Sequence, residues 1–143
     1  FLGDTGGTYI GWMMAGIAVM GDWSNRGLIQ ANAAPLLIFS VPIFDMIYTT
    51  VARIARGDVH NVREWIAYVG RDHLHHRLMG LGISQAHVVL AIVVLSLISG
   101  LAALVIVNVN LLQAWILLTQ AIVMYVMFSF VMIRATQKLK QNG

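Results

Sequence analysis

The chain has 143 residues, of which 59% are hydrophobic and only 10% are charged. Soluble domains carry roughly 25% charged residues, so this composition excludes an ordinary soluble domain and predicts a membrane protein. The absence of cysteine excludes disulfides and thiolate metal sites, and the small net charge of +3 resides in groups that flank apolar stretches, which argues against nucleic-acid binding.

Four apolar stretches predict helices that cross a membrane. We expect these spans at residues 5–21, 28–51, 86–107 and 111–133. The last two contain no charged residue, and each is long enough for the roughly 20 residues that a bilayer core of about 30 Å requires. The second contains Pro35, Pro42 and a single acid, Asp45. The sequence therefore predicts one all-α membrane domain over residues 1–143, a polytopic helix bundle.

The basic residues are distributed unequally between the two ends of these spans. Every one except Arg26 lies in the 52–84 loop or after the fourth span. Cytoplasmic loops carry an excess of Lys and Arg, so we expect this loop and the C-terminus to be cytoplasmic. Counting back two spans places Asp4 at the same membrane face.

The 52–84 loop contains the pattern of a short amphipathic helix. Apolar residues recur at helical spacing in Val62, Trp65, Ile66 and Val69. Asn61 with Glu64 three residues later is a variant of the capping box, and Gly70 follows as a stop. We expect this helix to lie in the plane of the membrane interface on the cytoplasmic side.

Three histidines, His73, His75 and His76, lie between Arg71 and Arg77. Guanidinium groups bind phosphate bidentately, and imidazoles can donate to phosphoryl oxygens. If this segment is helical, His73 and His76 share a face and His75 points about 100° away, so three histidine ligands to one metal would need a bent backbone. The other interpretation is an interfacial loop whose side chains snorkel toward lipid headgroups. The flanking arginines favour phosphate binding.

Two acids outside this cluster are candidate site residues. Asp4 lies among glycines that let a backbone approach a ligand, and Mg²⁺ binds one or two carboxylates together with phosphates and water; the alternative is a helix N-cap. Asp45 lies inside a span, where an acid must be paired or face a polar cavity. A structural pair with an arginine such as Arg53 and a catalytic role both remain open.

Three motifs occur in order along the chain. They are Phe1-Leu2-Gly3-Asp4-Thr5-Gly6, Val41-Pro42-Ile43-Phe44-Asp45 and Arg71-Asp72-His73-Leu74-His75-His76-Arg77-Leu78. Together they resemble the C-terminal part of the polyprenyl-phosphate N-acetylhexosamine-1-phosphate transferases. The resemblance runs from residue 1 to about residue 134, and the histidine motif is its most specific part.

The resemblance implies a Mg²⁺-dependent glycosyltransferase of the cell (inner) membrane, with Mn²⁺ as the alternative ion. Such enzymes transfer N-acetylhexosamine-1-phosphate from a UDP-sugar to polyprenyl (undecaprenyl) phosphate and release UMP, which initiates cell-wall, lipopolysaccharide or related polysaccharide synthesis. We expect UDP-GlcNAc as the sugar donor. Some members of the family are homodimers, and no residue of this chain argues for or against that.

The resemblance also implies residue roles. Asp4 matches the family's catalytic and magnesium-binding aspartate, and His73, His75 and His76 match a catalytic loop that holds the diphosphate and the amino sugar. The residues with an implied part in substrate binding are Phe1, which matches an aromatic that contacts uracil, and Arg71, Arg77 and Asp45.

The chain departs from the family pattern in two respects. Gly7 replaces a serine that is common in relatives, and the paired-aspartate motif is missing, because none of the five aspartates adjoins another. We therefore expect these 143 residues to be a fragment that is inactive alone. Two alternatives stay open: a non-enzymatic membrane protein that binds metal or anionic lipid through the His/Arg cluster, and a remnant with a structural role only.

Overall fold

The structure, a computed structural model, describes residues 3–68 and 73–142, and within these ranges it contains helices and no strands. The helices are α1 (Gly3–Met20), α2 (Leu28–Ile38), α3 (Ser40–Arg56), α4 (Val62–Ala67), α5 (Leu74–Gly80), α6 (Gln85–Ile106) and α7 (Leu111–Asn142). The all-α prediction is confirmed for the part of the chain that the structure describes.

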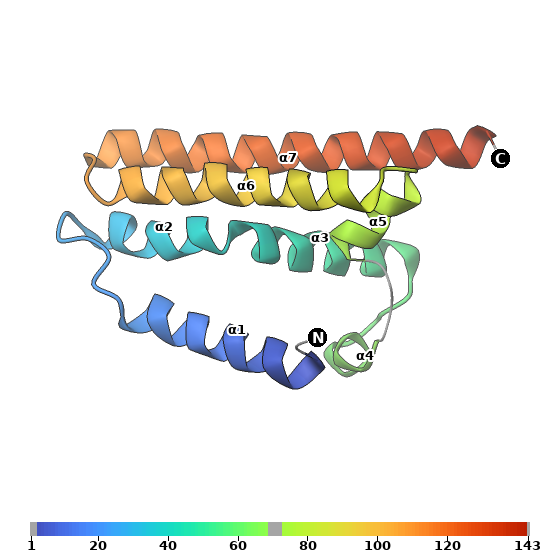
Figure 1. The fold of residues 1–143 in the computed structure, drawn as a ribbon, viewed down its shortest axis with the longest axis horizontal. Coiled ribbons are helices and arrows are strands. Elements are labelled where there is room, and N and C mark those ends of the chain that lie inside the picture. Colours follow the sequence, from blue (N-terminus) through green and yellow to red (C-terminus); the bar gives the residue numbers. More distant parts are fainter. Residues whose placement is uncertain (1–2, 69–72, 143) are drawn as a thin grey trace.

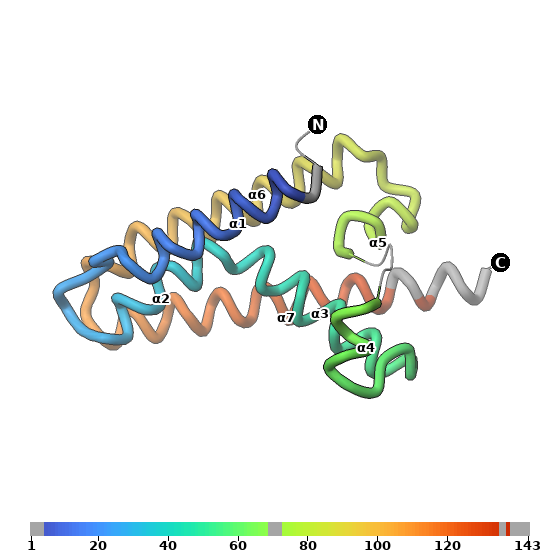
Figure 2. Tube along the Cα trace, turned by 90° about the horizontal axis from the view of Figure 1, so that it is seen from below, coloured from blue at the N-terminus to red at the C-terminus, as the bar shows by residue number. Residues whose placement is uncertain are grey.

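Helices α6 and α7 form a long antiparallel hairpin, and α2 with α3 forms a second row along α6 (Figure 1). Helix α1 lies outside this second row and most of its residues are exposed (Figure 1). The short helices α4 and α5 lie in the half of the molecule that contains the C-terminus (Figure 2). The two short helices therefore lie toward one end of the bundle.

Two of the described helices are long and apolar enough to cross a membrane, over Gln85–Ile106 and Leu111–Arg134. These agree with the predicted third and fourth spans. The second predicted span is broken: α2 and α3 meet at an angle of 74° and count as one bent span at most. Helix α1 covers the first predicted span but is not among these candidates, because glycines, threonines and an aspartate dilute its apolar residues. The predicted number of four spans is thus not confirmed.

The bend between α2 and α3 has a local chemical cause. Phe39 separates the two helices, and Pro42, in the first turn of α3, has no backbone N–H to continue the hydrogen-bond ladder. Polar side chains hold the break in place, since Ser40 Oγ lies 2.7 Å from the hydroxyl oxygen of Tyr125 in α7. Ser99 Oγ of α6 lies 3.1 Å from the same hydroxyl. One tyrosine therefore ties three helices together at the bend.

Two separate clusters of buried residues hold the bundle. The first joins α2, α6 and the start of α7 and consists mainly of small residues: Ala33, Ala34, Leu37, Ala103, Ile106 and Ala114. The second joins α5 to α6 and α7 through Leu74, Leu78, Val88 and Met132. Many large apolar side chains on the outer faces of α6 and α7 are exposed, as expected where a helix faces lipid.

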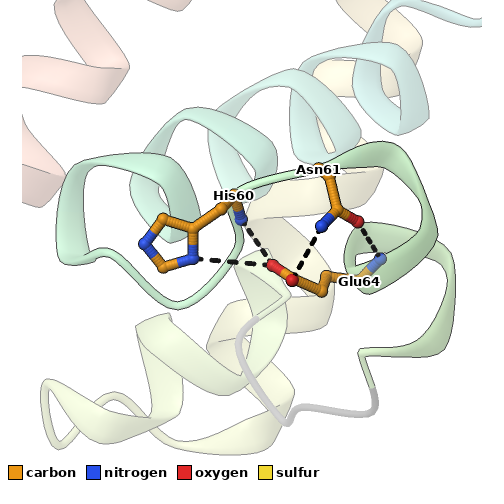
Figure 3. A network of polar contacts seen from close by, with 3 residues as sticks. All are labelled: His60, Asn61 and Glu64. Carbon is orange, nitrogen blue, oxygen red and sulfur yellow. Dashed lines mark hydrogen bonds and ion pairs between the residues drawn. The ribbon is translucent and has the colours of Figure 1, made fainter.

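The start of α4 confirms the predicted variant of the capping box, with the returning bond made to the residue before the N-cap (Figure 3). Asn61 Oδ1 accepts from the backbone N–H of Glu64 at 2.9 Å, and the Glu64 carboxylate accepts from the backbone N–H of His60 at 2.8 Å. Trp65 Nε1 donates to Thr50 Oγ1 at 2.9 Å, which fastens α4 to α3. The predicted Val69 and Gly70 lie outside the described residues.

Candidate functional site

The histidine segment forms the start of α5. The helix begins at Leu74, and His73 precedes it with an extended backbone (φ −62°, ψ 158°). The condition under which His73 and His76 would share a helical face is therefore not met, because His73 precedes the helix. The ring centroids of His75 and His76 are 4.0 Å apart, and the rings of His73 and His75 are nearly parallel with centroids 6.5 Å apart.

Helix α5 is held in place by its apolar face. Leu74 and Leu78, four residues apart, are 3% and 6% exposed and pack against α6 and α7. Residues at this spacing lie on one side of a helix. His75, His76 and Arg77 therefore occupy the other sides of α5. Burial of the two leucines thus turns these polar side chains away from the apolar cluster.

Asp45 of α3 lies directly against the first residues of this segment. Its Oδ2 is 2.9 Å from His73 Nδ1, and its Oδ1 accepts from the backbone N–H of Leu74 at 2.7 Å. Thr49 Oγ1, one turn further along α3, donates to the same Oδ1 at 3.4 Å. The acid predicted to need a partner inside its span thus pairs with a histidine, while Arg53 lies over the ring of Tyr68, 4.3 Å from its centroid.

The pKa of His75 is lowered from the usual value of 6.5. The main cause is partial desolvation of its ring, followed by the charge of His76, and Asp45 opposes the shift. His75 is thus a neutral imidazole at neutral pH, with one N–H to donate and one nitrogen to accept.

Arg77 connects the histidine segment to a groove between α3 and α7 with a volume of about 620 Å³. Most of its lining is apolar, and Arg56 and Arg77 supply the cations; the apolar walls include Phe44, Ile47, Val51 and Ile133. The guanidinium carbon of Arg77 lies 5.2 Å from the ring centroid of Tyr48, within the range of a cation–π contact. The groove therefore combines an apolar channel with positive charge next to the histidines.

The structure brings together five of the eight predicted site residues: Asp45, His73, His75, His76 and Arg77. Asp4 lies in the first turn of α1, its side chain being outside the described part, and Phe1 and Arg71 lie outside the described residues. The amino end of α1 lies in the same half of the long axis as α5 (Figures 1 and 2).

A metal site was also predicted at Asp4. The described side chains contain no group of three His, Cys, Asp or Glu residues that could hold an ion. Three-histidine coordination by His73, His75 and His76 is accordingly not formed in the described structure. A single carboxylate such as Asp4 fits Mg²⁺ only where phosphates and water complete the coordination.

Sequence reasoning did not identify two residues of the site, Tyr48 and Thr49. Tyr48 lies under Arg77, and Thr49 contacts Asp45. Helical spacing could have suggested both residues, because side chains three and four positions after Asp45 lie on the same face of the helix as Asp45. It was not decisive, since any aromatic or threonine in a span has that spacing to some neighbour.

The comparisons with known proteins give a relative that matches about three quarters of this chain. Over 105 residues the chain is 30% identical to a Bacillus subtilis (strain 168) protein named a probable undecaprenyl-phosphate N-acetylglucosaminyl 1-phosphate transferase. The match covers 73% of this chain and 27% of that protein, so the chain spans about a quarter of the relative's length. No family model and no solved structure matches the chain.

Proposed function

We propose that this chain, which is related to the polyprenyl-phosphate N-acetylhexosamine-1-phosphate transferases, forms part of an enzyme that joins a sugar-1-phosphate to a lipid phosphate. The relationship is supported by the 30% identity to the Bacillus protein and by the three motifs. We infer undecaprenyl phosphate as acceptor and an N-acetylglucosaminyl 1-phosphate group from the relative's name, and UDP-GlcNAc as its donor from the resemblance to the family. The step would initiate a cell-envelope polysaccharide at the cytoplasmic face of the inner membrane.

The observation that carries the proposal is the position of Arg77. It follows the histidines on α5 and also lines the groove between α3 and α7. An apolar groove beside a guanidinium suits an amphiphile with an anionic end, because the chain can stay in an apolar environment while the phosphate meets the cation. A polyprenyl phosphate has this construction.

The reaction must bring two anions together. An oxygen of the lipid phosphate attacks the sugar-linked phosphorus of the UDP-sugar, a new P–O bond forms, and the bond to UMP breaks with its electron pair on UMP. Arg77 and the histidines lower the repulsion by donating to phosphoryl oxygens. His75, neutral at neutral pH, contributes a hydrogen bond without a charge.

We further propose that Asp4 is a ligand of Mg²⁺, or of Mn²⁺ in its place. When bound, the ion would neutralise charge on the diphosphate and on the departing UMP. Since one carboxylate is not a complete site, other ligands must come from substrate phosphates, water and residues beyond the described ones. Phe1 and Arg71 are proposed to bind substrate on the strength of the motif alone.

The 143 residues are proposed to be inactive by themselves. None of their aspartates adjoins another, and the match covers only 27% of the relative. Catalysis should therefore require the longer protein. Expressed alone, the chain should release no UMP from UDP-GlcNAc and undecaprenyl phosphate.

The test is UMP release by the complete transferase that contains this chain, in detergent with both substrates. Arg77→Ala removes a charged hydrogen-bond donor worth about 1.5–3 kcal/mol, so turnover should fall by about 10- to 150-fold. Arg77→Lys should recover part of it, because the charge remains and the bidentate fork is lost. Arg26→Ala, an exposed arginine at the other end of the bundle, is the matched control.

Unchanged turnover in Arg77→Ala would overturn the assignment of this groove to the lipid phosphate. The other candidate is a non-enzymatic membrane protein that binds metal or anionic lipid; for its metal-binding form, the described side chains contain no group of three possible ligands. It would be supported by tight Zn²⁺ binding that needs His75 and His76, combined with no UMP release from the complete protein.

A further inference from the structure

We propose that Asp45 is a positioning residue that fixes both the start of α5 and the tautomer of His73. The inference rests on the proposed function only for its catalytic consequence. The two structural effects, on the backbone of α5 and on the ring of His73, can be measured whatever reaction the protein catalyses.

The first effect concerns the backbone of α5. The early N–H groups of a helix have no partner within the helix, and a side chain at the N-cap often supplies one. His73, the N-cap residue here, makes no such bond. Asp45 replaces it from another helix, since its Oδ1 accepts from Leu74 N at 2.7 Å. The position at which α5 begins is therefore set by α3.

The second effect concerns the proton on His73. Both oxygens of a carboxylate can only accept hydrogen bonds. When Asp45 is ionised, the contact of 2.9 Å between its Oδ2 and His73 Nδ1 therefore places the proton on Nδ1. This leaves Nε2 as the nitrogen available to a ligand, as an acceptor in the neutral ring and as a donor in the imidazolium.

Asp45 is itself held by neighbours on both sides. Thr49 donates to its Oδ1 at 3.4 Å, and the preceding residue, Phe44, stacks on Tyr125 with ring centroids 4.9 Å apart. Phe44 also meets Phe128 edge to face at 5.9 Å. The carboxylate is thus fixed relative to α7 as well as α3, while half of the His73 side chain remains exposed for a ligand.

The site therefore has two parts with different duties. Asp45 contacts the histidine segment and would not need to touch substrate, whereas His73 presents its free nitrogen. Loss of Asp45 should disturb the rate of the chemical step more than substrate binding, because a ring in the wrong tautomer can still occupy the site but cannot make the same hydrogen bond.

The experiment uses the complete protein with ¹⁵N-labelled histidine. In the wild type, long-range ¹H–¹⁵N spectra should show His73 with its proton on Nδ1 when neutral, and hydrogen exchange should show the Leu74 amide protected. Asp45→Asn, whose side chain keeps a single acceptor oxygen, should lose at least one of the two signatures and lower kcat by at least about 10-fold with KM changed less than about 3-fold. Asp45→Glu should restore part of kcat, since a carboxylate is again present.

Asp22→Asn is the matched control, because Asp22 is an exposed aspartate in the loop between α1 and α2. It should leave all three readouts unchanged. A wild-type His73 with its proton on Nε2 would overturn the proposal even if no Asp45 variant folds, and so would an Asp45→Asn protein with unchanged tautomer and exchange. If the signatures shift as expected but the wild type releases no UMP, the proposed function fails and the positioning role of Asp45 stands.

Discussion

The two ends of the bundle are held together by different kinds of contact. At the end where α6 turns into α7, small residues such as Ala34 and Ala114 let helices approach closely, and Gln30 closes the loop by donating to Val109 O at 3.3 Å. At the other end, Asp45 and two leucines dock a short helix that carries the histidines. The buried side chains at the first end are mostly small and apolar, whereas the second end brings three histidines next to a carboxylate and an arginine.

This difference indicates where the molecule tolerates change. The first end fixes the helices mainly through small apolar contacts. An end made of polar ties can hold a ligand-binding segment in a defined place, at the cost of depending on a few side chains. Substitutions at the two ends should therefore separate stability from site geometry.

The largest effect is expected for Leu74→Ala. Leu74 is 3% exposed and anchors α5, so its truncation should cost about 2–5 kcal/mol of local stability, felt mainly at the site end. Hydrogen exchange should show faster exchange over residues 74–80, with little change over residues 100–116. Equal acceleration at both ends would contradict the separation of the two clusters.

Ala34→Leu should destabilise the end where α6 turns into α7 and leave the histidine segment unchanged. Ala34 is 1% exposed among other small residues, and an added isobutyl group should cost about 1–3 kcal/mol by overpacking α2 against α6. Thermal unfolding in detergent should occur at a lower temperature. The Nδ1 proton of His73 should stay in place; its loss would show that the two ends are coupled.

Tyr125→Phe tests the hydrogen bonds by which one hydroxyl of α7 joins α3 and α6 between the two ends. Its hydroxyl meets Ser40 and Ser99 at the bend of the second span. Hydrogen bonds inside membrane proteins are worth about 0.6 kcal/mol on average, so the loss should be about 1 kcal/mol. Thermal unfolding of Tyr125→Phe and Ser99→Ala, singly and together, measures it, and fully additive effects would argue against a shared hydroxyl.

The smallest effect is expected from protonation of His75. Because its pKa is lowered from 6.5, the unfolded chain binds this proton more readily than the folded chain. Stability should therefore rise with pH between the lowered pKa and 6.5, and fall slightly on acidification through that window. Unfolding at pH 5 and pH 7 should differ less in His75→Gln than in wild type, and an NMR midpoint above 6.5 would reverse the sign.

Much of the fold could be predicted from composition and spacing. The two uncharged spans, the capping box at Asn61 and Glu64, and the helical class all follow from local patterns that neighbouring residues suffice to form. The bend at Phe39 was not predicted, although Pro42 has no backbone N–H for a helical hydrogen bond. Whether a proline kinks a helix or is accommodated depends on what neighbouring helices offer to the freed groups.

The site was predicted as a set of residue types rather than as an arrangement. The histidines, Arg77 and Asp45 were identified by motif, but the pairing of His73 with Asp45 was not foreseen. A face assignment from helical spacing failed at His73, because that residue lies one position before the helix begins. The start of α5 depends on an acceptor 29 residues away in the chain, so the residues around it do not reveal where the helix begins.

The sequence by itself determined that this is a helical membrane protein, that all but one of its Lys and Arg residues follow the second or the fourth apolar stretch, and that three histidines lie between two arginines. Hydrophobicity and charge are properties of each residue, so they can be read without coordinates. Only the tertiary structure decided that an acid in a bent span meets the start of α5 and that Arg77 reaches a groove between α3 and α7. Those contacts join residues far apart in the chain, and distance in space is set by packing rather than by composition.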